Sequence, residues 1–98
     1  PPLWVRLQGG ARVLVAGRST DLVCSTVGGR PTPTLSWWKG GTRLNTASDV
    51  TSLDGNMTRS TLTFTPSIDD AGRMISCKAI EPSFPHANHE DGFKMEIQ

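Results

Sequence analysis

The stretch that decides the fold is DLVCSTVGGRPTPTLSWWK, residues 21–39. It opens with an alternating run around a cysteine, passes through a turn rich in glycine and proline, and ends in two adjacent tryptophans, Trp37 and Trp38. Successive side chains of a β-strand point to opposite faces, so only one of the two can lie in a core. Leu35 shares the parity of Trp37, and Ser36 that of Trp38. The sequence therefore predicts that Trp37 is buried and Trp38 faces outward.

The rest of the chain repeats this pattern of short β-rich runs separated by turns, with almost no helix signal. Glycine and proline punctuate chains rather than extend strands, and here they cluster between the runs. The pattern is typical of an all-β sandwich or barrel. We expect strands at residues 3–7, 13–16, 20–27, 34–39, 42–44, 49–53, 60–65, 73–80 and 93–97, with a loop over residues 81–92.

Length and charge narrow the class of protein. The 98 residues are enough for one core, and 10 basic against 9 acidic residues give a net charge of +1. This balance excludes the dense basic stripe that a nucleic-acid partner requires. No run approaches the ~20 apolar residues of a membrane span. We expect residues 1–98 to be a single domain excised from a larger multi-domain ectodomain, with membrane attachment only through the parent chain.

The cysteines Cys24 and Cys77 could be free thiols, part of a metal site, or one disulfide. They lack the C-x-x-C spacing of zinc and redox sites, and each lies in a strand-like run. A bridge would close a loop of about 54 residues, which contributes roughly 4 kcal/mol in the chain-entropy model. If it forms, it places the domain in an oxidising compartment.

Strand parity extends the core if the two cysteines bridge two sheets. Residues two positions away from each cysteine then point inward, and the same alternation continues on the other strands. The predicted core comprises Leu22, Leu35, Trp37, Leu62, Phe64 and Ile75, with Ala79, Phe93, Met95 and Ile97 on the same inner faces.

Cys24, Trp37, Asp70, Gly72 and Cys77 together resemble the signature of an immunoglobulin domain, in which a tryptophan packs on an inter-sheet disulfide. The short distance between the cysteines leaves no room for the extra strand pair of a variable domain, so we expect an I-set or C2-set sandwich. One feature departs from the pattern. The chain has no tyrosine, and Ile75 stands where the corner tyrosine normally lies.

A narrower resemblance is to the second or third immunoglobulin domain of the Sidestep family, which are arthropod single-pass neuronal surface proteins. The similar motifs are Gly29-Arg30-Pro31, the double-tryptophan strand with Lys39-Gly40, Leu62 to Pro66, and Glu90 to Phe93. Nephrin-like adhesion domains share several of these features, including the longer run from Asp70 to Cys77.

The Sidestep resemblance implies cell recognition in the nervous system, with Beaten-path-type immunoglobulin proteins as partners. The domain would either contact the partner or act as a spacer between recognition domains. The alternative is a secreted immune-type domain that binds a soluble or microbial ligand.

Trp38 is the residue that the fold does not explain. By parity we expect it on the outer sheet face beside Lys78, Ile80 and Lys94. Because tryptophan is enriched at binding hot spots, these four residues form a candidate partner-binding set. The competing interpretation is that Trp38 lies under the lysine stems as a local packing and cation–π arrangement.

The remaining motifs are weaker. Asn56-Met57-Thr58 is an N-glycosylation acceptor beside an expected exposed turn at Asp54-Gly55. His86, His89, Glu90 and Asp91 resemble a ligand set but fall in the expected loop, so we predict no metal and no cofactor. No nucleophile–base arrangement or phosphate loop is present, which predicts that the domain is not an enzyme, has no catalytic residues and takes no small-molecule substrate.

Overall fold

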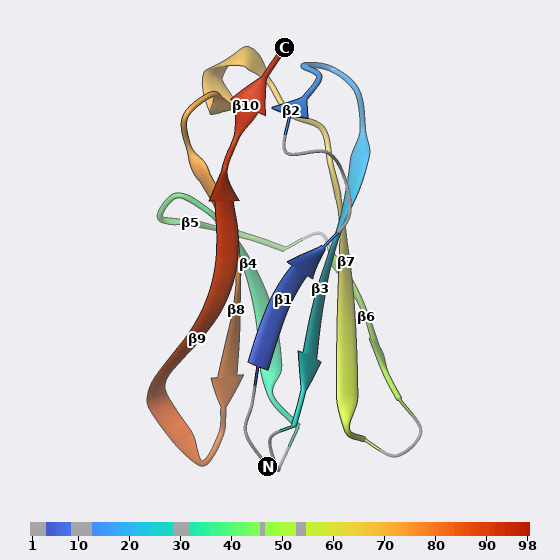
Figure 1. Ribbon diagram of the computed structural model, residues 1–98, viewed down its shortest axis with the longest axis vertical. Helices are drawn as coiled ribbons and strands as arrows, with labels where there is room; N and C mark the ends of the chain where they lie inside the picture. Colours follow the sequence, from blue (N-terminus) through green and yellow to red (C-terminus); the bar gives the residue numbers. More distant parts are fainter. Residues whose placement is uncertain (1–3, 9–12, 29–31, 46, 53–54) are drawn as a thin grey trace.

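The computed structural model describes residues 4–8, 13–28, 32–45, 47–52 and 55–98; of Phe84, Pro85 and Asn88 it describes only the backbone. The described part is built of strands and one short 3₁₀ turn, with β2 and β10 side by side at one end of the long axis (Figure 1). In chain order the elements are β1 (Trp4–Gln8), β2 (Val13–Leu14), β3 (Thr20–Val27), β4 (Thr34–Lys39), β5 (Thr42–Leu44), β6 (Ala47–Thr51), β7 (Met57–Phe64), η1 (Ile68–Asp70), β8 (Met74–Glu81), β9 (Phe84–Lys94) and β10 (Glu96–Ile97).

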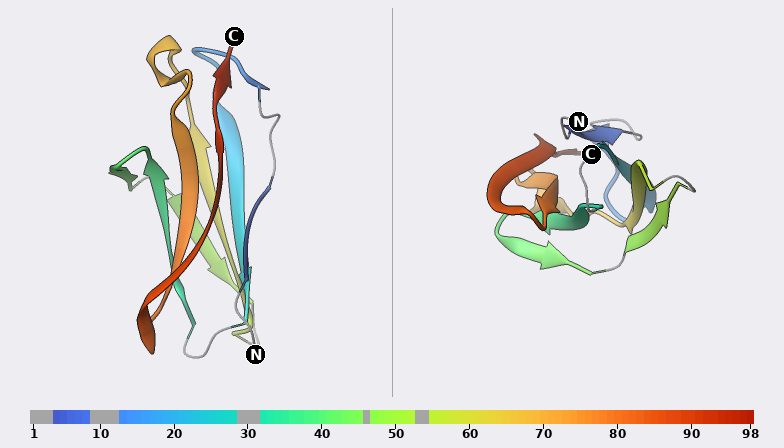
Figure 2. Two further views of the ribbon diagram at one scale, coloured as in Figure 1. Left: turned by 60° about the vertical axis from the view of Figure 1, so that its left-hand side comes forward. Right: turned by 90° about the horizontal axis from the view of Figure 1, so that it is seen from below.

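Two antiparallel four-stranded sheets pack face to face (Figure 2). One sheet has the strand order β1-β3-β7-β6, and the other has the order β5-β4-β8-β9. A parallel pairing of β10 with β2 joins the last strand to the start of the chain. This order matches the constant-type immunoglobulin sandwich, with one added strand, β5, beside β4. The predicted all-β sandwich is confirmed.

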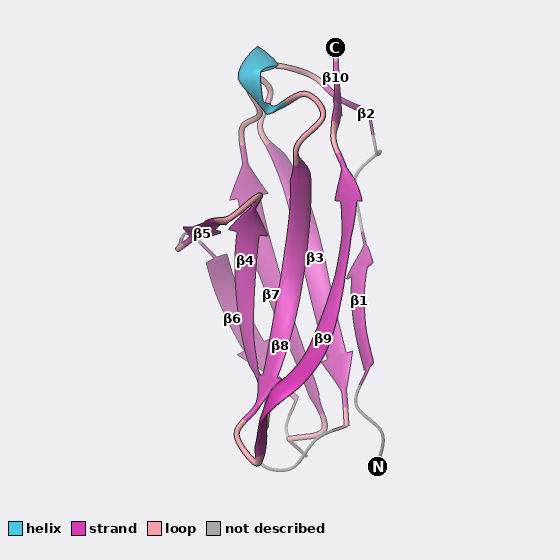
Figure 3. Cartoon of the chain, turned by 90° about the vertical axis from the view of Figure 1, so that its left-hand side faces the viewer, coloured by secondary structure: helices cyan, strands magenta, loops and turns pink. Residues whose placement is uncertain are grey.

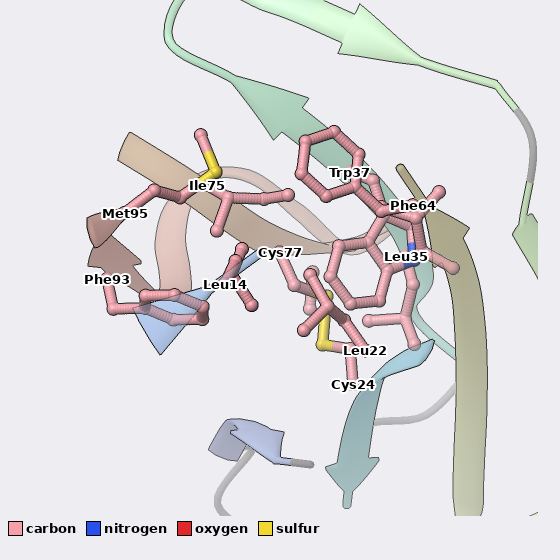
Figure 4. Close-up of a cluster of buried hydrophobic side chains, with 12 residues drawn as sticks. Leu14, Leu22, Cys24, Leu35, Trp37, Phe64, Ile75, Cys77, Phe93 and Met95 are labelled. Carbon is pink, nitrogen blue, oxygen red and sulfur yellow. A yellow bond between two sulfur atoms is a disulfide. The ribbon is translucent and has the colours of Figure 1, made fainter. Parts of the chain in front are cut away.

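The core lies between the inner faces of the two sheets and contains all six residues that the sequence places there. Leu22, Leu35, Trp37, Leu62, Phe64 and Ile75 are each at most 8% exposed. The Cys24–Cys77 disulfide joins β3 to β8 at the centre, next to Trp37 (Figure 4). The Trp37 indole N–H donates to Ser60 Oγ at 2.9 Å, which satisfies the one polar group of that ring inside the core.

The prediction of a loop at residues 81–92 is wrong. β8 and β9 form a hairpin with a turn at Pro82 and Ser83, and β9 runs from Phe84 to Lys94. Pro82 and Pro85 predict a break in the strand, but proline is tolerated on an edge strand or at a bulge, as at Pro85. β9 is an edge strand, and its register with β8 shifts between Ala79 and Glu81.

An ion pair occupies the corner that a tyrosine would normally stabilise. Asp70 is buried at the end of η1; its carboxylate accepts the Ser67 N–H at 2.9 Å and pairs with Lys39 Nζ at 3.0 Å. Burial raises the pKa of Asp70, but the Ser67 hydrogen bond and the charges of Lys39 and Arg73 outweigh it and hold that pKa below its ordinary value. The chain thus stabilises the corner with charge instead of a phenol.

Candidate functional site

The candidate partner-binding set lies on the outer face of the β5-β4-β8-β9 sheet, the face turned toward the viewer in Figure 3. Trp38 is half-buried, and the Lys78 ammonium lies 4.5 Å from the centre of its ring. The indole N–H donates to Ser36 Oγ at 2.9 Å. The ring is therefore held on the sheet by a cation above it and a hydrogen bond at its edge, which is the packing arrangement rather than an exposed anchor.

Sequence reasoning missed Ser36. Its outward parity suggests exposure, yet it is 6% exposed, and its hydroxyl also donates to the Lys78 carbonyl at 3.5 Å. Ser36 thus connects the Trp38 indole to the backbone of the neighbouring strand. The doubled tryptophan has two separate structural roles, with Trp37 in the core and Trp38 covering the outer face.

The expected neighbours of Trp38 need two corrections. Ile80 is in register with Thr34, four positions along β4 from Trp38. β8 lies between β4 and β9, and the register runs from Trp38 to Ser76 to Gly92, whereas Lys94 pairs with Met74. Lys94 is therefore displaced along the sheet from Trp38. On the other side of β4, Arg43 of β5 is opposite Trp38. Strand order could not be deduced from parity alone, which is why the sequence did not identify Arg43.

A shallow groove of about 540 Å³ follows β8 and β9 on this face. Gly92 is one of its lining residues, and a side chain is excluded there because a Cβ would lie 2.5 Å from the Ile75 carbonyl oxygen. Met74 and Ile80, 47% and 46% exposed, are the large apolar side chains on the β8 part of the face. The face therefore combines apolar and charged groups, as protein contact surfaces do.

The acceptor motif at Asn56 lies at the opposite sheet, where the chain enters β7. Asn56 is half-buried rather than exposed, and its carbonyl accepts the Gly28 N–H at 3.1 Å. Asp54, the first residue of the expected turn, lies outside the described residues. Gly55 adopts a φ of +73°, which suits a tight reversal of the chain.

The histidine cluster does not assemble into a metal site among the described residues. His89 instead pairs with Glu81 across the β8–β9 hairpin, at 3.3 Å. Asp91 turns its carboxylate toward the other sheet and accepts the Leu7 N–H at 2.8 Å. The described part of the chain also contains no helix long and apolar enough to span a membrane.

The paired sheets, the inter-sheet disulfide and the core tryptophan define an immunoglobulin-type sandwich without the second added strand of a variable domain. The model of the CD80-like C2-set immunoglobulin domain matches residues 6–87, and the chain belongs to that family.

The chain is also similar to relatives in sequence and to solved structures in fold. The chain is 32% identical to part of Kin of IRRE-like protein 1 of Rattus norvegicus, with 99% of this chain and 13% of the relative covered. It is 33% identical to part of human nephrin, with 84% of this chain and 6% of nephrin covered. The chain thus spans a small fraction of each of these relatives. In fold, it is similar to the full ectodomain of mouse nectin-like molecule 4 (TM-score 0.73, 20% identity, 98% and 33% covered). It is also similar to titin M4 (TM-score 0.64, 12% identity, 98% and 95% covered).

Proposed function

We propose that this domain is an extracellular cell-recognition module in the ectodomain of a Sidestep-like neuronal guidance protein. It belongs to a single-pass plasma-membrane protein, and it either binds immunoglobulin proteins of the Beaten-path type or spaces the domains that do. The observation that carries the recognition role is the C2-set sandwich, with relatives among Kirre-like and nephrin-type proteins. The Sidestep assignment rests on the motifs around Gly29-Arg30-Pro31, Trp37-Trp38 and Glu90-Asp91.

The proposed contact surface is the outer face of the β5-β4-β8-β9 sheet. Ile80 and Lys78 contribute the apolar and cationic contacts near one end, and Lys94 with Met74 extends the surface toward the other. Trp38 supports Lys78 from below. Since the Trp38 ring is already packed, we assign it to shaping the surface, and we assign direct contact to the more exposed Ile80.

The proposal assigns no catalysis and no cofactor, because adhesion-type immunoglobulin domains are not known as enzymes. The family and the buried disulfide support an extracellular location, since disulfides persist in oxidising compartments.

We also propose that Asn56 carries an N-linked glycan in the secretory pathway. A mass decrease after glycosidase treatment, absent in an Asn56→Gln variant, would test that modification.

The test of recognition is surface plasmon resonance, which measures binding of the isolated domain and of the full parent ectodomain to Beaten-path-type, Kirre-like and nephrin-type ectodomains. Binding to Beaten-path-type proteins alone supports the proposal. Binding only to the other two classes overturns the Sidestep assignment, and a parent ectodomain that binds none of them overturns the recognition role. If the parent binds and the isolated domain does not, the domain is a spacer.

The contact face has its own matched pair of variants. Ile80→Asp should weaken binding at least about tenfold, because it places a charge in the exposed apolar part of the contact, which binding would desolvate. Ile68→Asp is the control, since Ile68 is 76% exposed on η1, which is not part of the β5-β4-β8-β9 sheet. Equal effects of the two variants would exclude the proposed face.

A further inference from the structure

A second surface lies on the outer face of the β1-β3-β7-β6 sheet, close to the end of the sheet where β1 begins. In one row of the register, Val27 lies between Trp4 and Met57. In the adjacent row on the same face, Ser25 lies between Arg6 and Arg59, and Arg59 pairs in turn with Val50. These positions share one face of the sheet because they alternate with buried residues such as Cys24 and Thr58. We call this surface the arginine strip; it comprises Trp4, Arg6, Val27, Val50, Met57 and Arg59.

The apolar members of the arginine strip are unusually exposed for their size. Val50 is 68% exposed, Trp4 is 41% exposed and Met57 is 37% exposed. A hollow of about 300 Å³ lies at the β6–β7 side, lined by Val50, Ser52, Met57 and Arg59. Single exposed apolar residues need no explanation, but a row that crosses neighbouring strands and borders a hollow indicates an interaction surface.

The two arginines border this apolar row. The Arg6 guanidinium lies 5.2 Å from the centre of the Trp4 ring. Ser25 faces outward by parity but is 6% exposed, because it lies between Arg6 and Arg59. Both arginines are exposed, and the ion pairs found among the described residues do not involve either of them.

Among the described residues, no carboxylate lies in these two rows or in the next one, which holds Gln8, Val23, Thr61 and Ser48. In the described rows the first acid is Asp21, one row further on, where it accepts a hydrogen bond from Thr63 at 2.8 Å. The strip is therefore a cationic and apolar surface on a domain whose net charge is only +1. Its charge is complementary to a partner that presents carboxylates beside apolar side chains.

We propose that the arginine strip is a docking site for an acidic and apolar surface of another protein. Tryptophan and arginine are the residues most enriched at binding hot spots, and arginine binds carboxylates through two parallel hydrogen bonds. A polyanionic glycan fits less well, since it needs a denser set of cations and makes little use of Val50, Met57 and the Trp4 ring. This site is separate from the face around Ile80, so the domain can engage two partners on opposite sheets.

The test uses nuclear magnetic resonance titration of the domain, after enzymatic removal of N-linked glycans because Asn56 precedes Met57. The probe is the capped pentapeptide glutamate-leucine-glutamate-phenylalanine-glutamate, and its lysine-for-glutamate analogue is the control. We expect saturable shifts of the Trp4 indole and Met57 methyl signals, with a dissociation constant on the order of 1 mM for so small a contact. The lysine analogue should cause no shifts there.

Two variants separate the strip from general charge effects. Arg59→Glu should lower the affinity for the peptide at least about fivefold, as expected for the loss of one charge-assisted contact. Arg43→Glu makes the same change at an exposed position of the other sheet and should leave the affinity unchanged. The proposal is overturned if the peptide causes no chemical-shift changes at about 10 mM, or causes equal chemical-shift changes on the outer faces of both sheets. It is also overturned if a heparin hexasaccharide displaces the peptide from Trp4.

Discussion

Asp70→Ala tests the inference that an ion pair replaces the missing tyrosine at the corner before β8. The carboxylate makes two contacts: the Ser67 N–H at 2.9 Å and the Lys39 ammonium at 3.0 Å. The side chain of Asp70 is 5% exposed, and that of Lys39 is 25% exposed. Alanine removes both contacts without adding volume, so the stability change reports on the loss of these contacts.

The two lost contacts set the magnitude. Removing the cap on a backbone N–H costs about 0.5–2 kcal/mol. A hydrogen bond to a charged group contributes about 1.5–3 kcal/mol, and we take the lower end because the partly exposed Lys39 can turn toward water. The free energy of unfolding should therefore fall by roughly 2–3 kcal/mol. For a domain of this size each kcal/mol lowers the Tm by about 4–8 °C, which gives a decrease of roughly 8–24 °C.

The assay is urea denaturation followed by tryptophan fluorescence, together with a thermal melt. Asp69→Ala is the control, because Asp69 is the exposed neighbour on the same turn and should change stability by less than about 0.5 kcal/mol. Asp70→Asn keeps an oxygen for the Ser67 N–H and should have an intermediate cost. If Asp70→Ala costs no more than Asp69→Ala, the corner is stabilised by something other than this carboxylate.

The same carboxylate predicts a pH dependence. Because the folded state holds the pKa of Asp70 below its ordinary value of 3.8, the unfolded chain binds the proton more readily. The stabilisation is therefore fully present above pH 3.8 and is lost as the pH falls through the folded-state pKa. The stability difference between the wild type and Asp70→Asn should be constant from neutral pH to about pH 5 and shrink below the unfolded value. A difference that grows on acidification would contradict this sign.

Three further variants test the core and the β8–β9 pair. Gly92→Ala should lower the free energy of unfolding by about 1–3 kcal/mol or more, since its Cβ would lie 2.5 Å from a backbone oxygen of β8; a neutral result in a denaturant melt would mean that the strands are less closely paired. Ser60→Ala should cost about 1–3 kcal/mol by leaving the buried Trp37 indole N–H without its acceptor, whereas an unchanged melting curve would imply another acceptor. Replacing Cys24 and Cys77 by alanine should cost about 2–5 kcal/mol, and a smaller loss in reducing and non-reducing melts alike would show that the sheets hold together without the bridge.

Most of the core was predictable because it depends on local alternation. Once Cys24 and Cys77 are placed inside, the period of two fixes the side of every residue on the same strand, and this correctly buried Leu22 and Ile75. The hairpin at Pro82 was not predictable in the same way. Pro85 signals a break in the sequence, and only the position of β9 at the sheet edge removes the need for a backbone hydrogen bond there.

The surfaces depend on contacts between segments that are distant in sequence. Strand parity predicts that Trp38 faces outward, but its contacts with Lys78 and Ser36 determine that the ring packs on the sheet. Strand order determines that Gly92 and Arg43 are in register with Trp38, whereas Lys94 is not. The arginine strip was invisible because its members come from four strands, and none of them forms a motif alone.

The sequence alone therefore determined the class of fold and the inward faces, since both follow from local patterns of turns and of alternation within strands. It predicted the disulfide through the resemblance to an immunoglobulin domain. Only the tertiary structure decided which outward side chains lie side by side, because cross-strand register joins residues that the chain itself separates by tens of positions.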